Sequence, residues 1–283
     1  MDGKPLSDQV CKELSDYAME IRKKTLYTIG NLGSGHIGGA LSIVEILALL
    51  YGHEMKYDPK NPLWEDRDLL VLSKGHAGPA LYAALALKDF FPVEWLSTLN
   101  QGGSRLPSHC DRNKTPGIDM TTGSLGQGLS AACGLALGRR HDGSKVNIFC
   151  IIGDGETDEG QNWEAAMFAA KYRISSLIAF TDCNKMQIDG TTEQVMDLGN
   201  LEEKWRSFGW YVERCDGHDF NAMHNAISRS RIQAGKPDAK PSMIILDTIK
   251  GKGASFCEGK FENHYMPVTM EMAEEAIAAL GGK

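Results

Sequence analysis

The sequence predicts an α/β fold, a mostly parallel, doubly wound sheet with helices on both faces. Short apolar runs of strand character recur along the chain, and segments with helical periodicity separate them. Such alternation is typical of parallel strands joined by helical crossovers. With 283 residues, 42% of them hydrophobic, the chain can also bury a core large enough for this sheet.

Five strand-like runs are the expected strands. They are DLLVLS at 68–73, VNIFCII at 146–152, LIAFTD at 177–182, WYVERC at 210–215 and MIILDT at 243–248. Helical patterns lie near residues 41–51, 79–90, 126–140, 161–171 and 219–233. A helical preamble precedes the first run, and a tail helix, TMEMAEEAIAAL, follows the last. Since no repeat or convincing linker interrupts the pattern, we expect a single domain over residues 1–283.

Composition excludes several classes of function. The net charge of −7 and the pI near 5.6 argue against binding to nucleic acid or to an acidic membrane surface. A membrane-spanning helix needs about 18 to 20 apolar residues, and no apolar stretch of the sequence approaches this length. The N-terminus also lacks the hydrophobic region of a secretory signal peptide, so we expect a cytoplasmic protein. Seven cysteines without C-x-x-C pairs indicate reduced thiols. Cys110 and Cys183 are expected to be small buried hydrophobes.

Residues 153–190 carry the most specific pattern. The GDG turn at 153–155 ends one apolar strand, and Asn184 ends the next. The carboxyl ends of parallel strands share one edge of the sheet, so the Asp154 carboxylate and the Asn184 amide oxygen should lie together. With the main-chain carbonyl of Met186 they offer the oxygen ligands that Mg²⁺ prefers on a diphosphate. The glycines beside Asp154 let the backbone approach the phosphates.

A GDG turn or a strand-ending asparagine alone is more often structural. Their separation of 30 residues, one strand-helix-strand unit, is much more specific. On this pattern the chain resembles the thiamine-diphosphate enzymes, and within them the transketolases. The resemblance extends to five segments in the family's order: SGHIGGALS at 34–42, SKGHAGPALYAAL at 73–85, LPSH at 106–109, TTGSLGQGLS at 121–130, and TIKGKG at 248–253 with a histidine at 264.

The resemblance implies thiamine diphosphate as cofactor, bound through Mg²⁺, for which Ca²⁺ or Mn²⁺ can substitute. Asp154, Asn184 and Met186 would hold the metal. The cofactor-binding residues that the resemblance implies are His76, Gly123, Ser124, Leu125, Gly155, Asn184, Lys250 and His264.

Three histidines are the expected catalytic residues. A loop histidine taken alone is more often simply solvated, but His36, His109 and His264 each stand in a segment that matches a transketolase motif. By resemblance, His36 contacts substrate, His109 binds the donor's terminal hydroxyl, and His264 touches both cofactor and substrate. Imidazole suits these tasks because it donates or accepts a proton near neutral pH.

Several charged residues remain open to two interpretations. Lys74 and Lys252 could be simple surface charges. Glu159 either faces a partner domain near the cofactor, as in the family, or is a solvated charge in an acidic loop with Glu156 and Asp158.

Two positions depart from the family's pattern. Gly39 stands where the family often has a polar residue, so we expect one side-chain contact to the cofactor to be lost. The sequence CDRNKTPG after His109 differs from the usual turn near the substrate, so the sequence does not determine which substrate is bound.

The resemblance also implies a partner chain. Transketolases carry a second domain, whose glutamate protonates the cofactor's pyrimidine ring, and a third, C-terminal domain; this sequence shows no counterpart of either. We therefore expect the N-terminal subunit of a split transketolase, paired with a separately encoded C-terminal subunit that carries the pyrimidine-binding domain, in an α2β2 assembly. It would transfer a two-carbon ketol group from a ketose, expected to be phosphorylated, to an aldose.

Four alternatives stay open on sequence grounds. The α subunit of a 2-oxo acid dehydrogenase shares GDG and the asparagine but not these histidine motifs, and a deoxyxylulose-phosphate synthase is expected as one long chain. A non-catalytic homologue would only bind cofactor. A dinucleotide-binding oxidoreductase is poorly supported, because no G-x-G-x-x-G opens a helix after the first strand.

Overall fold

A five-stranded parallel sheet forms the centre of the computed structural model, which describes residues 4–281. The strand order is β2-β3-β4-β6-β5, and every neighbouring pair is parallel. The strands are β2 (Leu69–Leu72), β3 (Ile148–Gly153), β4 (Leu177–Cys183), β6 (Ser242–Asp247) and β5 (Tyr211–Asp216). All five lie where the sequence predicts strands, and the expected parallel α/β fold is confirmed.

The strands β2, β3, β4 and β6 are mainly apolar and buried because both faces of the sheet are covered, whereas the edge strand β5 is only partly buried. Along β3, Phe149 and Ile151 belong to one buried cluster, whereas Ile148, Cys150 and Ile152 belong to the other. Side chains alternate between the faces of a strand, so this single run contributes to two cores.

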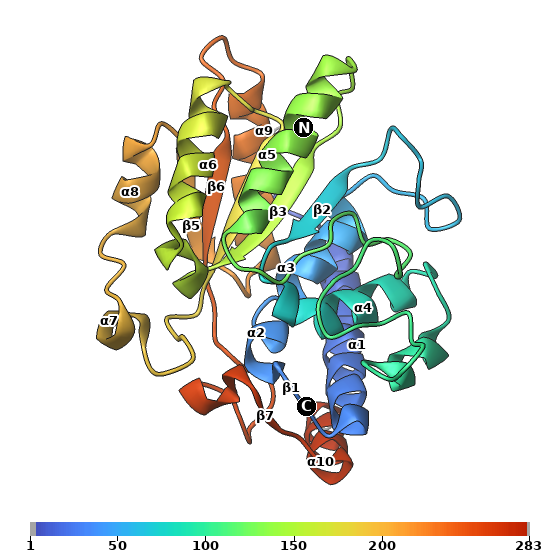
Figure 1. The fold of residues 1–283 in the computed structure, drawn as a ribbon. Coiled ribbons are helices and arrows are strands. Elements are labelled where there is room, and N and C mark those ends of the chain that lie inside the picture. The colour runs from blue at the N-terminus through green and yellow to red at the C-terminus, as the bar shows by residue number, and fades with distance from the viewer. Residues whose placement is uncertain (1–3, 282–283) are drawn as a thin grey trace.

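Helices cover the two faces in separate layers (Figure 1). One layer consists of α5 (Gln127–His141), α6 (Gly160–Lys171) and α8 (Leu201–Ser207). The other consists of α1 (Asp8–Leu32), α3 (Val44–Leu49), α4 (Gly78–Leu87) and α9 (Phe220–Ala234). Helix α1 is the expected N-terminal preamble; the Ser7 hydroxyl caps its start, and Gly33, with φ of 90°, ends it.

The helix expected near residues 41–51 is interrupted. The chain forms α2 (Ile37–Leu41), then α3, then a π-helical turn η1 (Leu50–Glu54). At the break, the Ser42 hydroxyl donates to Asp182 Oδ2 at 2.6 Å, and its oxygen lies 3.2 Å from Gly39 O. At this interruption the Ser42 side chain points toward the end of β4, a contact that helical periodicity alone does not predict.

Short elements bring two distant parts of the chain together. Strand β1 (Ser34–Gly35) pairs antiparallel with β7 (Met266–Pro267), and α10 (Met270–Gly281), the expected tail helix, packs on α1. The contact between these helices is close, because a Cβ at Gly30 would lie 2.6 Å from Ala273 Cβ. The remaining short helices are η2 (Gly75–Ala77), η3 (Val93–Thr98), η4 (Gly155–Asp158), α7 (Thr192–Val195) and η5 (Phe261–His264).

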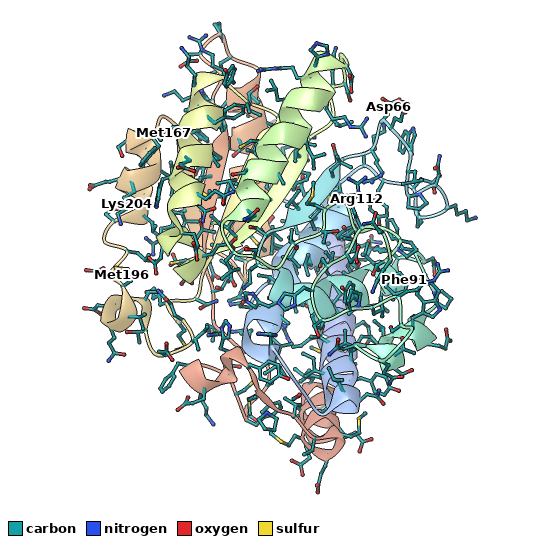
Figure 2. All side chains as sticks on the ribbon, viewed as in Figure 1. Asp66, Phe91, Arg112, Met167, Met196 and Lys204 are labelled. Carbon is teal, nitrogen blue, oxygen red and sulfur yellow. The ribbon has the colours of Figure 1, made fainter. Side chains whose placement is uncertain are left out.

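Some apolar side chains remain on the surface. Met167 on α6 is 55% exposed and Met196, just after α7, is 58% exposed, and both lie along the same margin of the molecule (Figure 2). Among residues 4–281, no helix combines the length and the apolar character that crossing a bilayer requires.

Candidate active site

The carboxyl ends of β2, β3, β4 and β6 border one cavity of about 100 Å³. Gly153 at the end of β3 lies opposite Asp182 of β4, so the residues that follow the two strands emerge together. The lining residues come from these strand ends and the segments that follow them, from α2, from the segment before α5 and from η5; they are Gly39, Lys74, His76, Leu125, Gly153, Asp154, Gly155, Glu156, Asn184, Met186, Gln187, Ile188, Lys250 and His264. The predicted metal ligands and most predicted cofactor contacts are thus brought together.

Asp154 is a buried carboxylate at the base of this cavity. Its side chain is held by two backbone amides, Gly155 N at 2.8 Å and Lys185 N at 2.5 Å. Burial, together with the neighbouring Asp182, raises the pKa of Asp154 to about 7. A carboxylate in this state lacks full charge compensation, so a nearby cation would stabilise its ionised form.

Asn184 and Met186 complete a set of oxygen donors. The Asn184 amide donates from Nδ2 to Asp182 at 3.1 Å, which fixes the orientation of its Oδ1, and Oδ1 accepts from Met186 N at 3.2 Å. Carboxylate, amide and main-chain carbonyl oxygens are the hard ligands that Mg²⁺, Ca²⁺ and Mn²⁺ prefer. The donor set beside an undercompensated Asp154 therefore fits a divalent cation.

Lys74 and Asp182 form a buried ion pair beneath these donors, and the interpretation of Lys74 as a surface charge is wrong. Lys74 is 2% exposed and Asp182 is fully buried. Burial alone raises the pKa of Asp182, but Lys74 and hydrogen bonds from Ser42 and Thr248 hold it below its usual value. The sequence does carry a signal for Asp182, since it is the one charged residue in the run LIAFTD.

Glu156 is also buried, which corrects its interpretation as a solvated charge. It accepts hydrogen bonds from the Ser73 hydroxyl, from Gly126 N at 2.9 Å and from Gly153 N at 3.0 Å. This one carboxylate therefore ties together the end of β2, the start of α5 and the end of β3. Glu159, three residues later, is exposed.

Lys250 reaches the cavity from the loop after β6. Its side chain is almost fully buried and its Nζ donates to Gln187 O at 3.2 Å. Burial and the neighbouring Lys74 lower its pKa to about 8. The cavity therefore holds two lysines suited to a polyanion such as a diphosphate.

Four predicted histidines cluster beside the lysines. The His36 ring centroid lies 5.2 Å from that of His76, 5.7 Å from His109 and 5.3 Å from His264. Burial lowers the pKa of His36 to about 4, with contributions from His109 and Lys250. The pKa of His264 falls to about 4 for the same main reason, and those of His76 and His109 are also lowered. Near pH 7 the four rings are therefore neutral, and each offers one donor and one acceptor.

Glycines allow the side chains of this cluster to pack closely against the backbone. Gly123 has φ of 145°, and a Cβ there would lie 3.1 Å from the His109 ring. A Cβ at Gly39 would lie 3.1 Å from His76 Nε2 and 3.3 Å from Lys74 Nζ. The departure at Gly39 therefore gives room to two polar side chains of the cavity. Leu125 lines the cavity and the neighbouring Ser124 is exposed.

The two cysteines near the site are structural. Cys110 is 1% exposed and Cys183 is 6% exposed, and burial raises the pKa of each thiol to about 12. Both are therefore protonated, unreactive thiols near neutral pH. Their burial agrees with the expectation of small buried hydrophobes.

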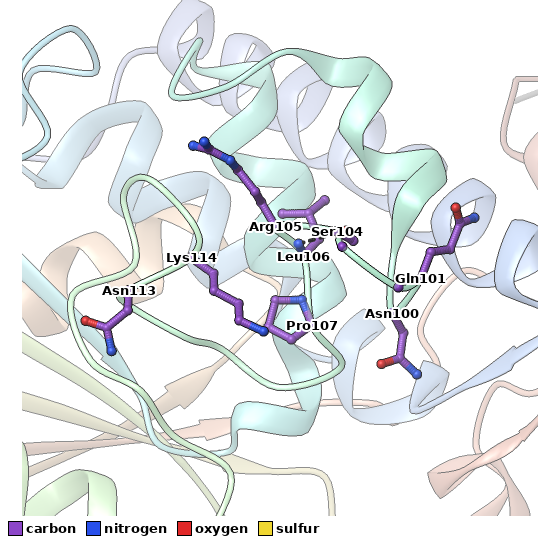
Figure 3. Close-up of a pocket in the computed structure, with 10 residues that line it drawn as sticks. Asn100, Gln101, Ser104, Arg105, Leu106, Pro107, Asn113 and Lys114 are labelled. Atoms are coloured by element: carbon purple, nitrogen blue, oxygen red, sulfur yellow. Dashed lines mark hydrogen bonds between the residues drawn. The ribbon is translucent and has the colours of Figure 1, made fainter.

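A second, larger hollow of about 580 Å³ lies between the segments before and after His109 (Figure 3). Asn100, Gln101, Ser104 and Pro107 are among its lining residues. Lys114 extends toward Pro107, whereas Arg105 projects away from it (Figure 3), toward the Trp95 ring. Since no buried ionisable group lines this hollow, the smaller cavity at the strand ends is the better candidate for chemistry.

Comparison with known proteins agrees with this geometry. The profile of a family domain, described as the transketolase, thiamine diphosphate binding domain, matches residues 15–283. The chain belongs to the transketolase family. Its GDG turn and Asn184 are thus part of a transketolase domain, as the resemblance implies.

Relatives of this transketolase chain include short proteins named as subunits. It is 59% identical to the 6-deoxy-6-sulfo-D-fructose transketolase subunit SqwG of Clostridium sp. (strain MSTE9), over 95% of this chain and 96% of that one. It is 39% identical to one of the named subunits of apulose-4-phosphate transketolase from Actinobacillus succinogenes, over 95% of this chain and 96% of that one.

Solved transketolases share the fold over part of their length. The structure from Campylobacter jejuni aligns with a TM-score of 0.86 and 30% identity, over 98% of this chain but 43% of its own. The transketolase chain described here therefore spans less than half of that enzyme.

Proposed function

We propose that this chain is the diphosphate-binding subunit of a two-chain transketolase that moves a two-carbon ketol group from a ketose to an aldose. The observation that carries the proposal is one cavity in which oxygen donors, two buried lysines and neutral histidines converge at the carboxyl edge of the sheet. The subunit names of its similar-length relatives support the need for a second chain.

The cavity residues divide into three roles. Asp154, Asn184 and the Met186 carbonyl would hold Mg²⁺, or Ca²⁺ or Mn²⁺ in its place. His76, Lys250 and the backbone at Gly155 would bind the diphosphate of thiamine diphosphate, with Gly123, Ser124 and Leu125 beside its rings. His264 would touch both cofactor and substrate.

When bound, thiamine diphosphate supplies the carbon nucleophile that attacks a ketose carbonyl. The residues of this chain would orient the substrate and exchange protons with it. His36, His109 and His264 are neutral near pH 7, so each can donate to a substrate oxygen at one ring nitrogen while the other accepts a proton. Lys74 and Lys250 would offset the negative charge of the diphosphate.

The relatives suggest a substrate class. Because the relative with 59% identity is named for 6-deoxy-6-sulfo-D-fructose, we propose that ketose as the first donor to test. Fructose 6-phosphate has the same carbon chain with phosphate in place of sulfonate, and apulose 4-phosphate is the sugar named for the 39% relative.

The proposed partner is a separately encoded C-terminal transketolase subunit with a pyrimidine-binding domain, in an α2β2 assembly. We further propose a cytoplasmic location, which the seven cysteines support, because all seven are free thiols.

The test is reconstitution. This chain and the product of a neighbouring transketolase-like gene would be purified separately, then mixed with thiamine diphosphate and Mg²⁺, and ketol transfer from each of the three donors measured. Turnover in the mixture and in neither protein alone is expected. Turnover by this chain alone would overturn the two-chain proposal, and a preference for another donor would overturn the substrate assignment only.

A further inference from the structure

The loop that carries Lys250 is anchored at four consecutive residues. One anchor lies in the cavity wall, where Lys250 Nζ donates to Gln187 O. Two more involve residues outside the lining: the Thr248 hydroxyl donates to Asp182, and Gly251 N donates to Gly38 O. The fourth is a contact to a ring, in which Ile249 N donates to His218 Nε2 at 2.9 Å.

This fourth contact determines the tautomer of His218. An amide N–H can only donate, so Nε2 must be unprotonated, and a neutral ring then carries its proton on Nδ1. His218 Nδ1 lies 3.0 Å from Glu45 Oε2, which accepts that proton in a hydrogen bond. The ring is therefore matched to a donor on one side and an acceptor on the other.

Glu45 is itself held in place. It is 9% exposed, and its other carboxylate oxygen pairs with the buried Arg22. Burial alone raises the pKa of Glu45, but the His218 hydrogen bond and Arg22 bring it below its usual value, so it remains an acceptor. A hydrogen-bonded chain thus runs from α1 through α3 to His218 and the Lys250 loop.

We propose that His218 is a positioning residue for the cofactor site: with its proton held on Nδ1 by Glu45, it fixes the Ile249 amide and thereby the place of Lys250 in the cavity. The inference rests on the proposed function, in which Lys250 meets the cofactor diphosphate. His218 is not among the residues that line the cavity, so it acts through the backbone.

Two substitutions of His218 distinguish its contact to Ile249 from its contact to Glu45. In His218→Gln the longer side chain places an amide oxygen near the former Nε2, where it can still accept from Ile249. In His218→Asn the amide ends near the former Nδ1, so the contact to Glu45 can survive while Ile249 loses its acceptor. His141→Asn, at the exposed end of α5, is the matched control.

The first readout needs no cofactor. Hydrogen exchange of the segment 248–253 should accelerate by about fivefold or more in His218→Asn, as expected for one lost hydrogen bond, and stay near wild type in His218→Gln and in the control. In the wild-type chain, NMR of the ring nitrogens should show the Nδ1–H tautomer. An Nε2–H tautomer, or unchanged exchange in His218→Asn, would overturn the proposal.

The second readout is cofactor affinity in the mixture with the partner chain at saturating Mg²⁺. The Kd for thiamine diphosphate should rise about tenfold in His218→Asn, with kcat at saturating cofactor little changed and the affinity largely restored in His218→Gln. Equal losses in both variants would indicate a general packing role and contradict positioning. If the wild-type mixture binds no cofactor, the proposed function fails, while the exchange experiment still decides whether His218 anchors the loop.

Discussion

Asp154 is held in a state that favours binding over stability. Burial and Asp182 raise its pKa to about 7, so above that pH the folded chain carries a poorly compensated charge. In Asp154→Asn we expect cofactor affinity in the presence of Mg²⁺ to fall by at least about a hundredfold, because the metal loses its charged ligand. Without metal, the melting temperature at pH 8 should be equal to or above that of wild type.

Calorimetric titration and thermal unfolding together check this prediction. Asp158→Asn is the control, since Asp158 is an exposed carboxylate in the same turn. Normal Mg²⁺-dependent binding by Asp154→Asn would remove Asp154 from the metal site.

We expect that breaking the Lys74–Asp182 ion pair strongly destabilises the folded chain. Both side chains are buried, so Lys74→Met leaves an uncompensated carboxylate and should lower the free energy of unfolding by about 3 kcal/mol. The double variant Lys74→Met/Asp182→Asn removes both charges and should regain most of that loss. Urea denaturation of the four proteins in the cycle measures the coupling; additive losses would show that the pair is not coupled.

At the residue scale, the sequence predicts what lies in a local motif and misses what depends on distant contacts. Asp154 and Asn184 follow strands whose ends can be located from the sequence. Lys74 is 108 positions from Asp182, so nothing near it in the chain shows that it is buried in an ion pair. The burial of Glu156 escapes prediction for the same reason, because its partners come from three different elements.

At the scale of elements, α5 offers a matched pair of glycines. A Cβ at Gly128 would lie 2.6 Å from Ser73 Cα, so Gly128→Ala must push α5 away from the end of β2. A Cβ at Gly134 has no neighbouring atom within 4 Å. We expect Gly128→Ala to lower the free energy of unfolding by about 2 kcal/mol and Gly134→Ala to raise it by about 0.5 kcal/mol. Urea denaturation checks both; a destabilised Gly134→Ala would mean that helix propensity does not govern that face.

The elements that the sequence predicts well are those whose pattern is local. The strands β2, β3, β4 and β6 are mainly apolar runs, the edge strand β5 has residues of strand character, and the helices α5, α6 and α9 begin and end within two residues of the expected positions. The hydrogen bond that Ser42 makes at the break is not predictable, because its partner Asp182 lies 140 positions away. The two-residue strands β1 and β7 are too short to leave any periodic signal.

For the whole molecule, the neutral histidines predict acid sensitivity. The pKa values of His36 and His264 lie near 4 in the folded chain, below the usual 6.5. Between these values the unfolded chain binds protons that the folded chain does not, so stability falls as the pH drops from 6.5 toward 4. Allowing for solvent screening, each should account for about 1 kcal/mol of lost stability at pH 5 relative to pH 7.

Urea denaturation of the metal-free chain at pH 7 and pH 5 measures this loss. The double variant His36→Asn/His264→Asn should lose less stability over that interval than wild type does. Identical losses would show that these rings do not titrate below their usual range.

The pairing of β1 with β7 also has a consequence for how the protein is made. His36 is synthesised early and His264 late, yet the two rings lie 5.3 Å apart. All five strands of the main sheet precede β7 in the chain. The histidine cluster therefore cannot be complete until the segment after β6 has been synthesised, so the sheet has all its strands before the site has all its histidines.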